Sequence, residues 1–257
     1  MAIQGIDHVV VIGADLERLA EQYRALGFTV TPGGRHPEAG ADNALIPFED
    51  DSFIELLAFR EPRPDMRWAR LVARGGGLAD FVLNSDAVEL DLAAARRNRL
   101  PYGAAEPGRR IRPDGVEVSW LAGPVSDTSF GLPSLIQDVT PRELRVPGGA
   151  ARVHANGATG MARLIVAVNN IDNASLLYQG LLAEDAETAR VTDEFIEAVF
   201  RVGQQHIVLR QPLIAGPLRQ HILQFGDSPY ALELSAPAAR EFDPQAASGA
   251  RISIIAE

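Results

Sequence analysis

The sequence predicts an α+β protein built from repeated βαβββ modules that pair into cupped, mixed sheets. Three observations support this prediction. An apolar strand is followed at once by an amphipathic helix near residue 5, the pattern returns near residues 78 and 160, and strand-like stretches follow each helix. Repetition at a period of roughly 70 residues is typical of a duplicated structural unit.

Composition and charge narrow the classes of protein that the chain can represent. The 257 residues carry a formal net charge of −10, and none is cysteine. Net negative charge disfavours nucleic acid and anionic membranes as partners, and the lack of cysteine excludes disulfides and thiolate ligands. No apolar run reaches the roughly 20 residues that span a bilayer, and the N-terminus does not resemble a signal peptide. We expect a cytoplasmic protein with a small-molecule ligand, and a homodimer is compatible with the sequence.

The first module is predicted within the first 59 residues. Its first strand, residues 5–12, is mostly β-branched and apolar and is interrupted by His8. Asp15 then precedes apolar residues at helical spacing, as expected of a helix N-cap, and Gly27 ends the helix. Further strands are predicted at 28–30, 44–48 and 52–59, with a Gly- and Pro-rich loop at 32–43.

The same pattern continues through the rest of the chain. A short helix at 67–74 precedes the second module, which has a strand at 78–83, a helix at 86–99 and strands at 116–121 and 134–138. The third module has a strand at 160–168, a helix at 173–182 and strands near 194–202 and 205–211, and a shorter copy has strands at 230–235 and 251–256. We therefore predict an N-terminal pair of modules (1–142), a linker (143–158) and a C-terminal pair (159–257) whose second module is truncated.

Three stretches resemble the vicinal oxygen chelate superfamily, and within it the glyoxalase-like domain proteins: Gly5-Ile6-Asp7-His8-Val9-Val10, Tyr23-Arg24-Ala25-Leu26-Gly27-Phe28 and Phe53-Ile54-Glu55-Leu56-Leu57. The resemblance covers nearly the whole chain. It implies paired βαβββ modules, as in glyoxalase, bleomycin resistance proteins and dihydroxybiphenyl dioxygenase. It also implies a cup that commonly holds a divalent metal such as Zn²⁺, Ni²⁺, Mn²⁺ or Fe²⁺, and an activity of the lyase, isomerase or dioxygenase type.

In this superfamily the metal ligands come from the first and fourth strands of the paired modules. The resemblance therefore assigns His8 and Glu55 as ligands from the first module and Gln137 as the fourth-strand ligand of the second, whose first-strand position falls near Ala79 or Asp80. The corresponding positions of the third module are Arg163 and Arg210, which cannot bind a cation. We expect the site to lie in the N-terminal cup.

His8 and Glu55 are also unusual on physical grounds, because each interrupts an otherwise apolar strand. Alternation along the strand is expected to place His8 on the same face as Ile6 and Val10. A carboxylate among apolar neighbours is costly unless it is paired or bound to metal. The two residues therefore predict a metal site with an open position, a metal-free base with a raised pKa at Glu55, or a paired core contact.

Four further residues are candidate substrate contacts: His36, Asn43, Trp120 and Gln137. His36 lies in a predicted loop at the mouth of the cup, where it contacts the substrate, serves as a third metal ligand or is exposed. The remaining histidines, at positions 154, 206 and 221, are expected to be structural or exposed. The sequence thus predicts an enzyme acting on a small carbonyl or hydroxy compound, with His8 and Glu55 as catalytic residues. The alternative is a non-catalytic binding or sequestering protein similar to the bleomycin-resistance proteins.

Overall fold

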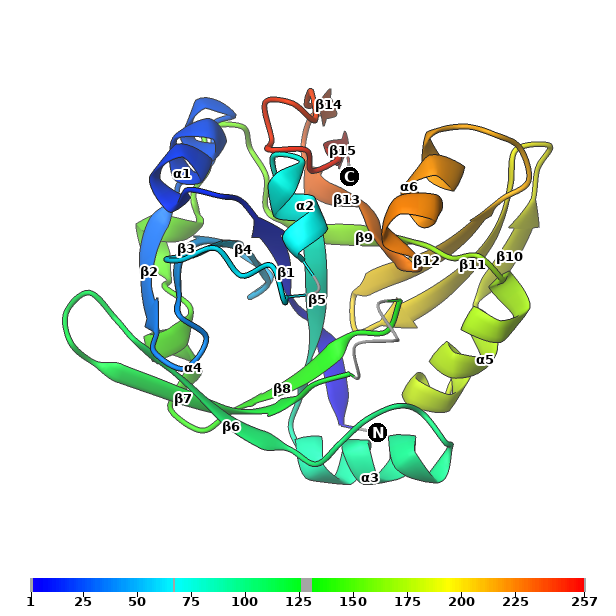
Figure 1. Cartoon of the computed structure of the whole chain (residues 1–257), viewed down its shortest axis with the longest axis horizontal. Coiled ribbons are helices and arrows are strands. Elements are labelled where there is room, and N and C mark those ends of the chain that lie inside the picture. Colours follow the sequence, from blue (N-terminus) through cyan, green and yellow to red (C-terminus); the bar gives the residue numbers. More distant parts are fainter. Residues whose placement is uncertain (1, 67, 126–130, 257) are drawn as a thin grey trace.

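The computed structural model of the chain describes residues 2–66, 68–125 and 131–256, which form a closed barrel beside a seven-stranded sheet (Figure 1). The barrel contains the elements β1 (Ile3–Ile12), α1 (Leu16–Ala25), β2 (Thr31–His36), β3 (Ala41–Pro47), β4 (Phe53–Phe59), α2 (Ala69–Ala73), β5 (Gly77–Ser85), α3 (Val88–Arg97), β6 (Glu106–Ile111), β7 (Glu117–Gly123) and β8 (Ser134–Asp138).

The rest of the chain forms the second sheet and its covering helices. These elements are α4 (Arg142–Arg145), the 3₁₀ turn η1 (Gly149–Arg152), β9 (Gly160–Ala167), α5 (Ile171–Leu182), β10 (Thr188–Val191), β11 (Phe195–Val202), β12 (Gln205–Pro212), α6 (Pro217–Phe225), β13 (Ser228–Ala236), β14 (Arg240–Glu241) and β15 (Ile252–Ala256). Among the described residues, no helix combines the length and the apolar character needed to cross a bilayer.

The two halves of the barrel have the same strand order, β1-β4-β3-β2 and β5-β8-β7-β6. In each half the first strand runs parallel to the last, and the remaining neighbours are antiparallel. The halves join through antiparallel pairing of β1 with β5 and a short contact of β2 with β6. This arrangement confirms the predicted fold class of paired βαβββ modules.

The seven-stranded sheet repeats part of this order. Its strands follow β10-β11-β12-β9-β13-β15-β14. As with β1, β4 and β5 in the barrel, β9 runs parallel to β12 and antiparallel to β13. The pairing of β13 with β15 is parallel, as is that of β5 with β8.

Local sequence signals explain the first helix of the barrel. The Asp15 side chain accepts a hydrogen bond from the backbone N–H of Arg18 at 2.8 Å, which satisfies one of the free donors at the start of α1. The buried face of the helix is Leu19, Ala20 and Tyr23. The predicted helix is therefore confirmed. Its apolar stripe packs in the core that the barrel shares with the second sheet.

The segment after α1 differs from the sequence prediction. Residues 28–30 are not a strand, and the predicted loop at 32–43 contains β2 and the start of β3. Its glycines allow a close approach between strands rather than a loop: a Cβ on Gly34, whose φ is 139°, would lie 2.1 Å from the carbonyl oxygen of Ile111 in β6. The strand β6 was also not predicted.

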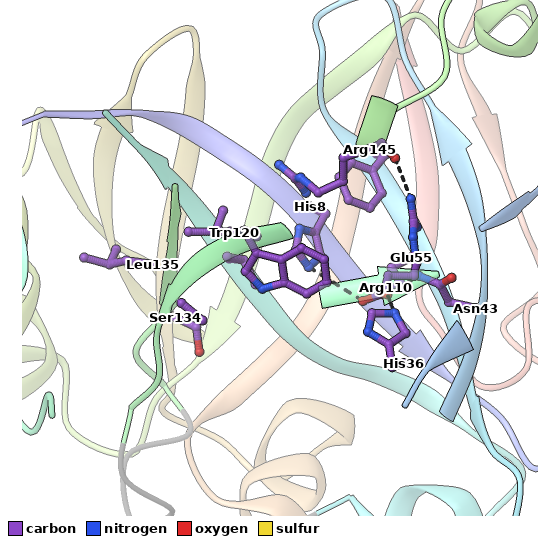
Figure 2. Close-up of a pocket in the computed structure, with 13 residues that line it drawn as sticks. His8, His36, Asn43, Glu55, Arg110, Trp120, Ser134, Leu135 and Arg145 are labelled. Carbon is purple, nitrogen blue, oxygen red and sulfur yellow. Dashed lines mark hydrogen bonds and ion pairs between the residues drawn. The ribbon is translucent and has the colours of Figure 1, made fainter. Parts of the chain in front are cut away.

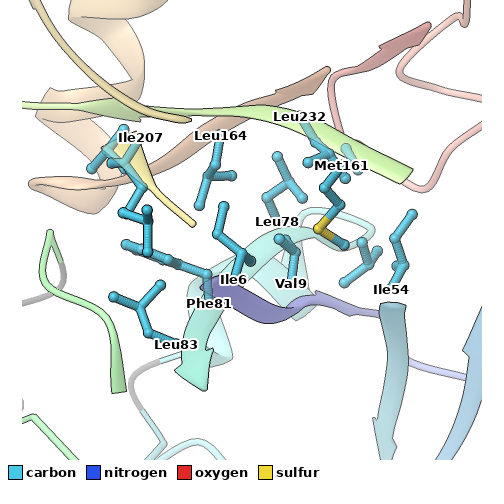
Figure 3. Close-up of a cluster of buried hydrophobic side chains, with 14 of the residues drawn as sticks. Ile6, Val9, Ile54, Leu78, Phe81, Leu83, Met161, Leu164, Ile207 and Leu232 are labelled. Carbon is cyan, nitrogen blue, oxygen red and sulfur yellow. The ribbon is translucent and has the colours of Figure 1, made fainter. Parts of the chain in front are cut away.

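The apolar core joins the barrel to the second sheet. Side chains from the outer face of β1 and β5 pack against side chains from β9, β12 and β13, as Figure 3 shows for Ile6, Val9, Phe81, Leu83, Met161, Leu164, Ile207 and Leu232. The pairing of β1 with β5 is irregular between Ile6 and His8. Ile6 therefore faces this core, whereas His8 faces the barrel interior, so the prediction that the two share a face is wrong.

Candidate functional site

A pocket inside the barrel contains most of the candidate residues. Every barrel strand contributes to its lining, and α4 adds Arg145 (Figure 2). The free volume is about 140 Å³, close to that of a cavity that admits benzene, so the pocket suits a ligand of about six non-hydrogen atoms. A larger hollow of about 630 Å³ lies between α2 and α6, but none of the predicted site residues lines it.

Glu55 on β4 is the centre of the polar side of the pocket. Its Oε1 accepts a hydrogen bond from Asn43 Nδ2 at 2.5 Å and lies 3.4 Å from His36 Nε2. Its Oε2 lies 3.7 Å from His8 Nε2. Burial alone would raise the pKa of Glu55, but His36, His8 and the Asn43 amide together lower it to about 2. The prediction of a raised pKa is therefore wrong, because the carboxylate has three polar neighbours.

The lowered pKa of Glu55 should appear in the acid stability of the protein. The folded-state pKa lies below the ordinary value of 4.5, so Glu55 stabilises the fold above about pH 4.5 and loses this contribution as the pH falls toward 2. We expect the free energy of unfolding of a Glu55→Gln variant, measured with urea at stepped pH, to vary less with pH across this window than that of the unmodified protein. Equal pH dependence in both proteins would contradict the lowered pKa.

Asp7 fixes the orientation of His8. Asp7 Oδ1 lies 2.5 Å from His8 Nδ1. Burial of Asp7 raises its pKa, yet Arg145 and His8 hold it well below the ordinary value. The ionised carboxylate can only accept a hydrogen bond, so these partners assign the proton to Nδ1 and leave His8 Nε2 for the pocket. Phe53 stacks on the imidazole at 4.6 Å between ring centroids and holds its plane.

Asp7 is in turn held by the segment after β8. Arg145 Nη1 and Nη2 donate to the two Asp7 oxygens at 2.9 and 2.7 Å, and Arg145 Nε donates to Asp138 at 2.5 Å. Arg142 also contacts Asp7, at 2.5 Å. Residues 143–158 were predicted as a linker, but Arg145 from this stretch lines the pocket. Sequence reasoning missed Asp7, although it directly precedes His8 in the strand.

Arg110 on β6 was also missed, and it is a second cation of the pocket wall. Arg110 is only 3% exposed, and its Nη2 donates a hydrogen bond to the Arg145 carbonyl oxygen at 2.8 Å. Burial lowers the pKa of Arg110 to about 10, so the side chain remains cationic at neutral pH. Gly33 makes room for this group, because a Cβ there would lie 2.2 Å from Asn43 Oδ1 and 3.0 Å from Arg110 Nη1.

The other predicted residues divide into two groups. Trp120 lines the pocket, with its ring centroid 5.9 Å from that of His36. Gln137 lies outside the pocket, and β8 instead turns Ile136 toward it. The Gln137 side-chain oxygen accepts a hydrogen bond from the Val88 N–H at 3.0 Å. The structure thus brings together His8, His36, Asn43, Glu55 and Trp120. Gln137 remains on β8, and its side chain contacts the first residue of α3.

Gln137 is expected to act on stability rather than on ligand binding. The N-cap of α3, Ala87, has no side-chain cap, and the Gln137 amide supplies the missing acceptor. We expect Gln137→Ala to lower the free energy of unfolding in urea by about 1 kcal/mol, as for the loss of an ordinary N-cap. Ligand affinity of the folded variant should stay unchanged, and a selective loss of affinity would place Gln137 back in the site.

The residues present do not fit the metal site that the resemblance implies. On β5, the first strand of the second half, the residue that lines the pocket is Val82, which pairs with His8. On β8, which matches β4 in strand order, Ile136 lines the pocket in place of Gln137. Neither can bind a metal, and the described residues contain no group of three or more His, Cys, Asp or Glu arranged to hold one. The cationic Arg110 and Arg145 in the same wall further disfavour a bound cation.

The paired βαβββ modules around an internal pocket place the protein in the vicinal oxygen chelate superfamily. The chain belongs to the glyoxalase-like domain family, whose model matches residues 6–182. No protein of curated function matches its sequence.

Solved structures share the fold at low sequence identity. A hypothetical protein from Staphylococcus aureus is similar with a TM-score of 0.74 and 12% identity, over 98% of this chain and 99% of the other. A mutant 4-hydroxymandelate synthase from Streptomyces coelicolor is similar with a TM-score of 0.66 and 17% identity, over 93% of this chain and 72% of the other. A fusion of a xylose isomerase-like TIM barrel with 4-hydroxyphenylpyruvate dioxygenase is similar with a TM-score of 0.56 and 17% identity, over 92% of this chain and 37% of the other. At these identities the likeness concerns the fold.

Proposed function

We propose that the protein is an enzyme that acts on a small carbonyl or hydroxy compound in the barrel pocket by proton transfer, with His8 as the base. The observation that supports this proposal is the position of the His8 ring between two carboxylates. Asp7 contacts Nδ1 at 2.5 Å, and Glu55 lies 3.7 Å from Nε2. A positioned imidazole of this kind is a common general base.

The two carboxylates have different roles in the proposed step. Asp7 holds the proton on Nδ1 and keeps Nε2 as the acceptor. When Nε2 takes a proton from a carbon or oxygen next to the substrate carbonyl, the new N–H points toward Glu55. Glu55 is ionised, because its pKa is about 2, so it stabilises the imidazolium that forms. A carboxylate of such low pKa is a weak base, which favours His8 over Glu55 as the proton acceptor.

A binding protein without catalysis is the second candidate function. The apolar side of the pocket supports it, since Val82, Ala122 and Ile136 line it beside the polar groups. Such a protein would hold the same small ligands and return them unchanged. The two functions differ in whether the ligand exchanges a proton with the pocket.

Hydrogen exchange in heavy water separates these functions. α-Ketoaldehydes, lactones, catechols and 2-oxo acids would be incubated with protein purified without chelator, and deuterium incorporation and turnover followed by NMR. We expect exchange or turnover of at least one class, and we expect it to survive treatment with a chelator. His206→Gln is the matched control, because His206 lies on β12 in the second sheet. Binding of a panel member without exchange or turnover would support the binding protein instead, and activity that requires added metal would refute the metal-free mechanism.

A further inference from the structure

The pocket contains a buried cation that the proposed proton transfer does not use. Arg110 is 3% exposed, and its one hydrogen bond among the described residues runs from Nη2 to the Arg145 carbonyl. Its Nε has no hydrogen-bond partner in the described part of the chain. A guanidinium carries five N–H donors, so most of its binding capacity is left for another group.

Glu55 is the carboxylate whose charge acts on Arg110, and like the nearest acids of the Arg145 network it has closer partners. Asp7 and Asp138 are held by Arg142 and Arg145. Glu55 oxygens are shared between the Asn43 amide and the two histidines, and no described carboxylate forms an ion pair with Arg110. A buried charge without a direct counter-charge is costly, and an anionic ligand would remove this cost.

A second polar atom in the pocket is also without a partner. Asn43 is 3% exposed and donates from its Nδ2 to Glu55, whereas its Oδ1 has no hydrogen-bond partner within residues 2–66, 68–125 and 131–256. This oxygen can accept a hydrogen bond from a hydroxyl group. A Cβ on Gly33 would contact both Asn43 Oδ1 and Arg110 Nη1, so these two atoms lie around the same space.

We propose that Arg110 binds the carboxylate of the ligand, so that the pocket takes small 2-oxo or 2-hydroxy acids. The planar guanidinium matches the two oxygens of a carboxylate. Asn43 Oδ1 accepts from the hydroxyl or enol of the ligand, and the apolar wall of Val82, Ala122 and Ile136 receives its aliphatic end. A free volume of about 140 Å³ limits the ligand to the size of a short-chain acid. This proposal deepens the proposed function by naming the substrate class.

Isothermal titration calorimetry with a matched ligand pair tests this subsite directly. 2-Oxobutanoate and 2-oxobutanamide have nearly the same shape and differ in the carboxylate. We expect the unmodified protein to prefer the acid and Arg110→Met to weaken acid binding roughly 10- to 100-fold, with little effect on the amide. Arg110→Lys keeps the charge but not the planar guanidinium. Its affinity for the acid should lie between that of the unmodified protein and that of Arg110→Met. Arg109→Met is the matched control, because Arg109 is the neighbouring residue and pairs with Glu38 and Glu117 on the surface.

Several outcomes would overturn the carboxylate subsite. Equal binding of acid and amide to the unmodified protein would do so, as would inorganic phosphate competing as well as the acid. Unchanged acid binding in a folded Arg110→Met or Arg110→Lys variant would exclude Arg110 as the anchor. The titration does not require turnover, so acid-selective binding without hydrogen exchange would refute the proposed enzyme activity and leave the carboxylate subsite standing.

Discussion

Replacing His8 by glutamine should lower turnover by roughly 10²- to 10⁴-fold, the contribution expected of a positioned general base. Glutamine keeps a polar side chain of similar size but cannot take a proton from the substrate. The kcat of the first substrate found in the panel is the quantity to measure. Since the carboxylate anchor is a separate group, ligand affinity should change far less than kcat.

Asp7→Asn is a sharper test of the same step. An amide in place of the carboxylate can donate to His8 Nδ1, which moves the imidazole proton to Nε2 and removes the acceptor from the pocket. We expect a loss of kcat in the same range, with the pH profile of the residual activity altered. If both variants turn over substrate at the unmodified rate, while the His206→Gln control also behaves normally, His8 is not the base.

Arg145→Met should be the most destabilising substitution in the pocket wall. Arg145 is 3% exposed and binds both oxygens of the fully buried Asp7. Removing it leaves a buried carboxylate with fewer partners, and breaking such a pair costs about 3–5 kcal/mol. The measurement is the free energy of unfolding in urea. Because the retained Arg142 still contacts Asp7, the loss should fall at the lower end of this range.

A double-mutant cycle separates the charge pair from simple packing. Asp7→Asn combined with Arg145→Met removes both charges. We expect the double variant to lose less free energy of unfolding than the two single variants lose together. Arg109→Met, which removes an arginine at the surface, should change stability little. Additive losses in the cycle would show that Arg145 stabilises the fold through its other contacts, with Asp138 and the Phe53 ring, rather than through Asp7.

The parts of the fold with regular apolar patterns could be predicted from the sequence. β1 contains a continuous β-branched run, and α1 follows a period of 3.6 residues with a clear N-cap at Asp15. β2 and β6 could not be predicted, because their glycines, prolines and arginines lack an apolar face. Their strand conformation follows from pairing with distant segments, which local propensity does not reveal.

The candidate site shows the same division. His8 and Glu55 stand out because each is a polar residue within an apolar strand, and the structure brings them together. Arg110 and Arg145 lie in polar segments where an arginine carries no signal, and only closure of the barrel buries them. Gln137 was chosen one position away from Ile136, and because side chains alternate along a strand, a shift of one residue reverses the face.

The most direct test of the central claim is a crystal structure of the protein soaked with 2-oxobutanoate. The account predicts ligand density inside the barrel, with the carboxylate on Arg110 and the carbon next to the carbonyl within reach of His8 Nε2. Density in the larger hollow between α2 and α6, with the barrel pocket left without ligand, would contradict it.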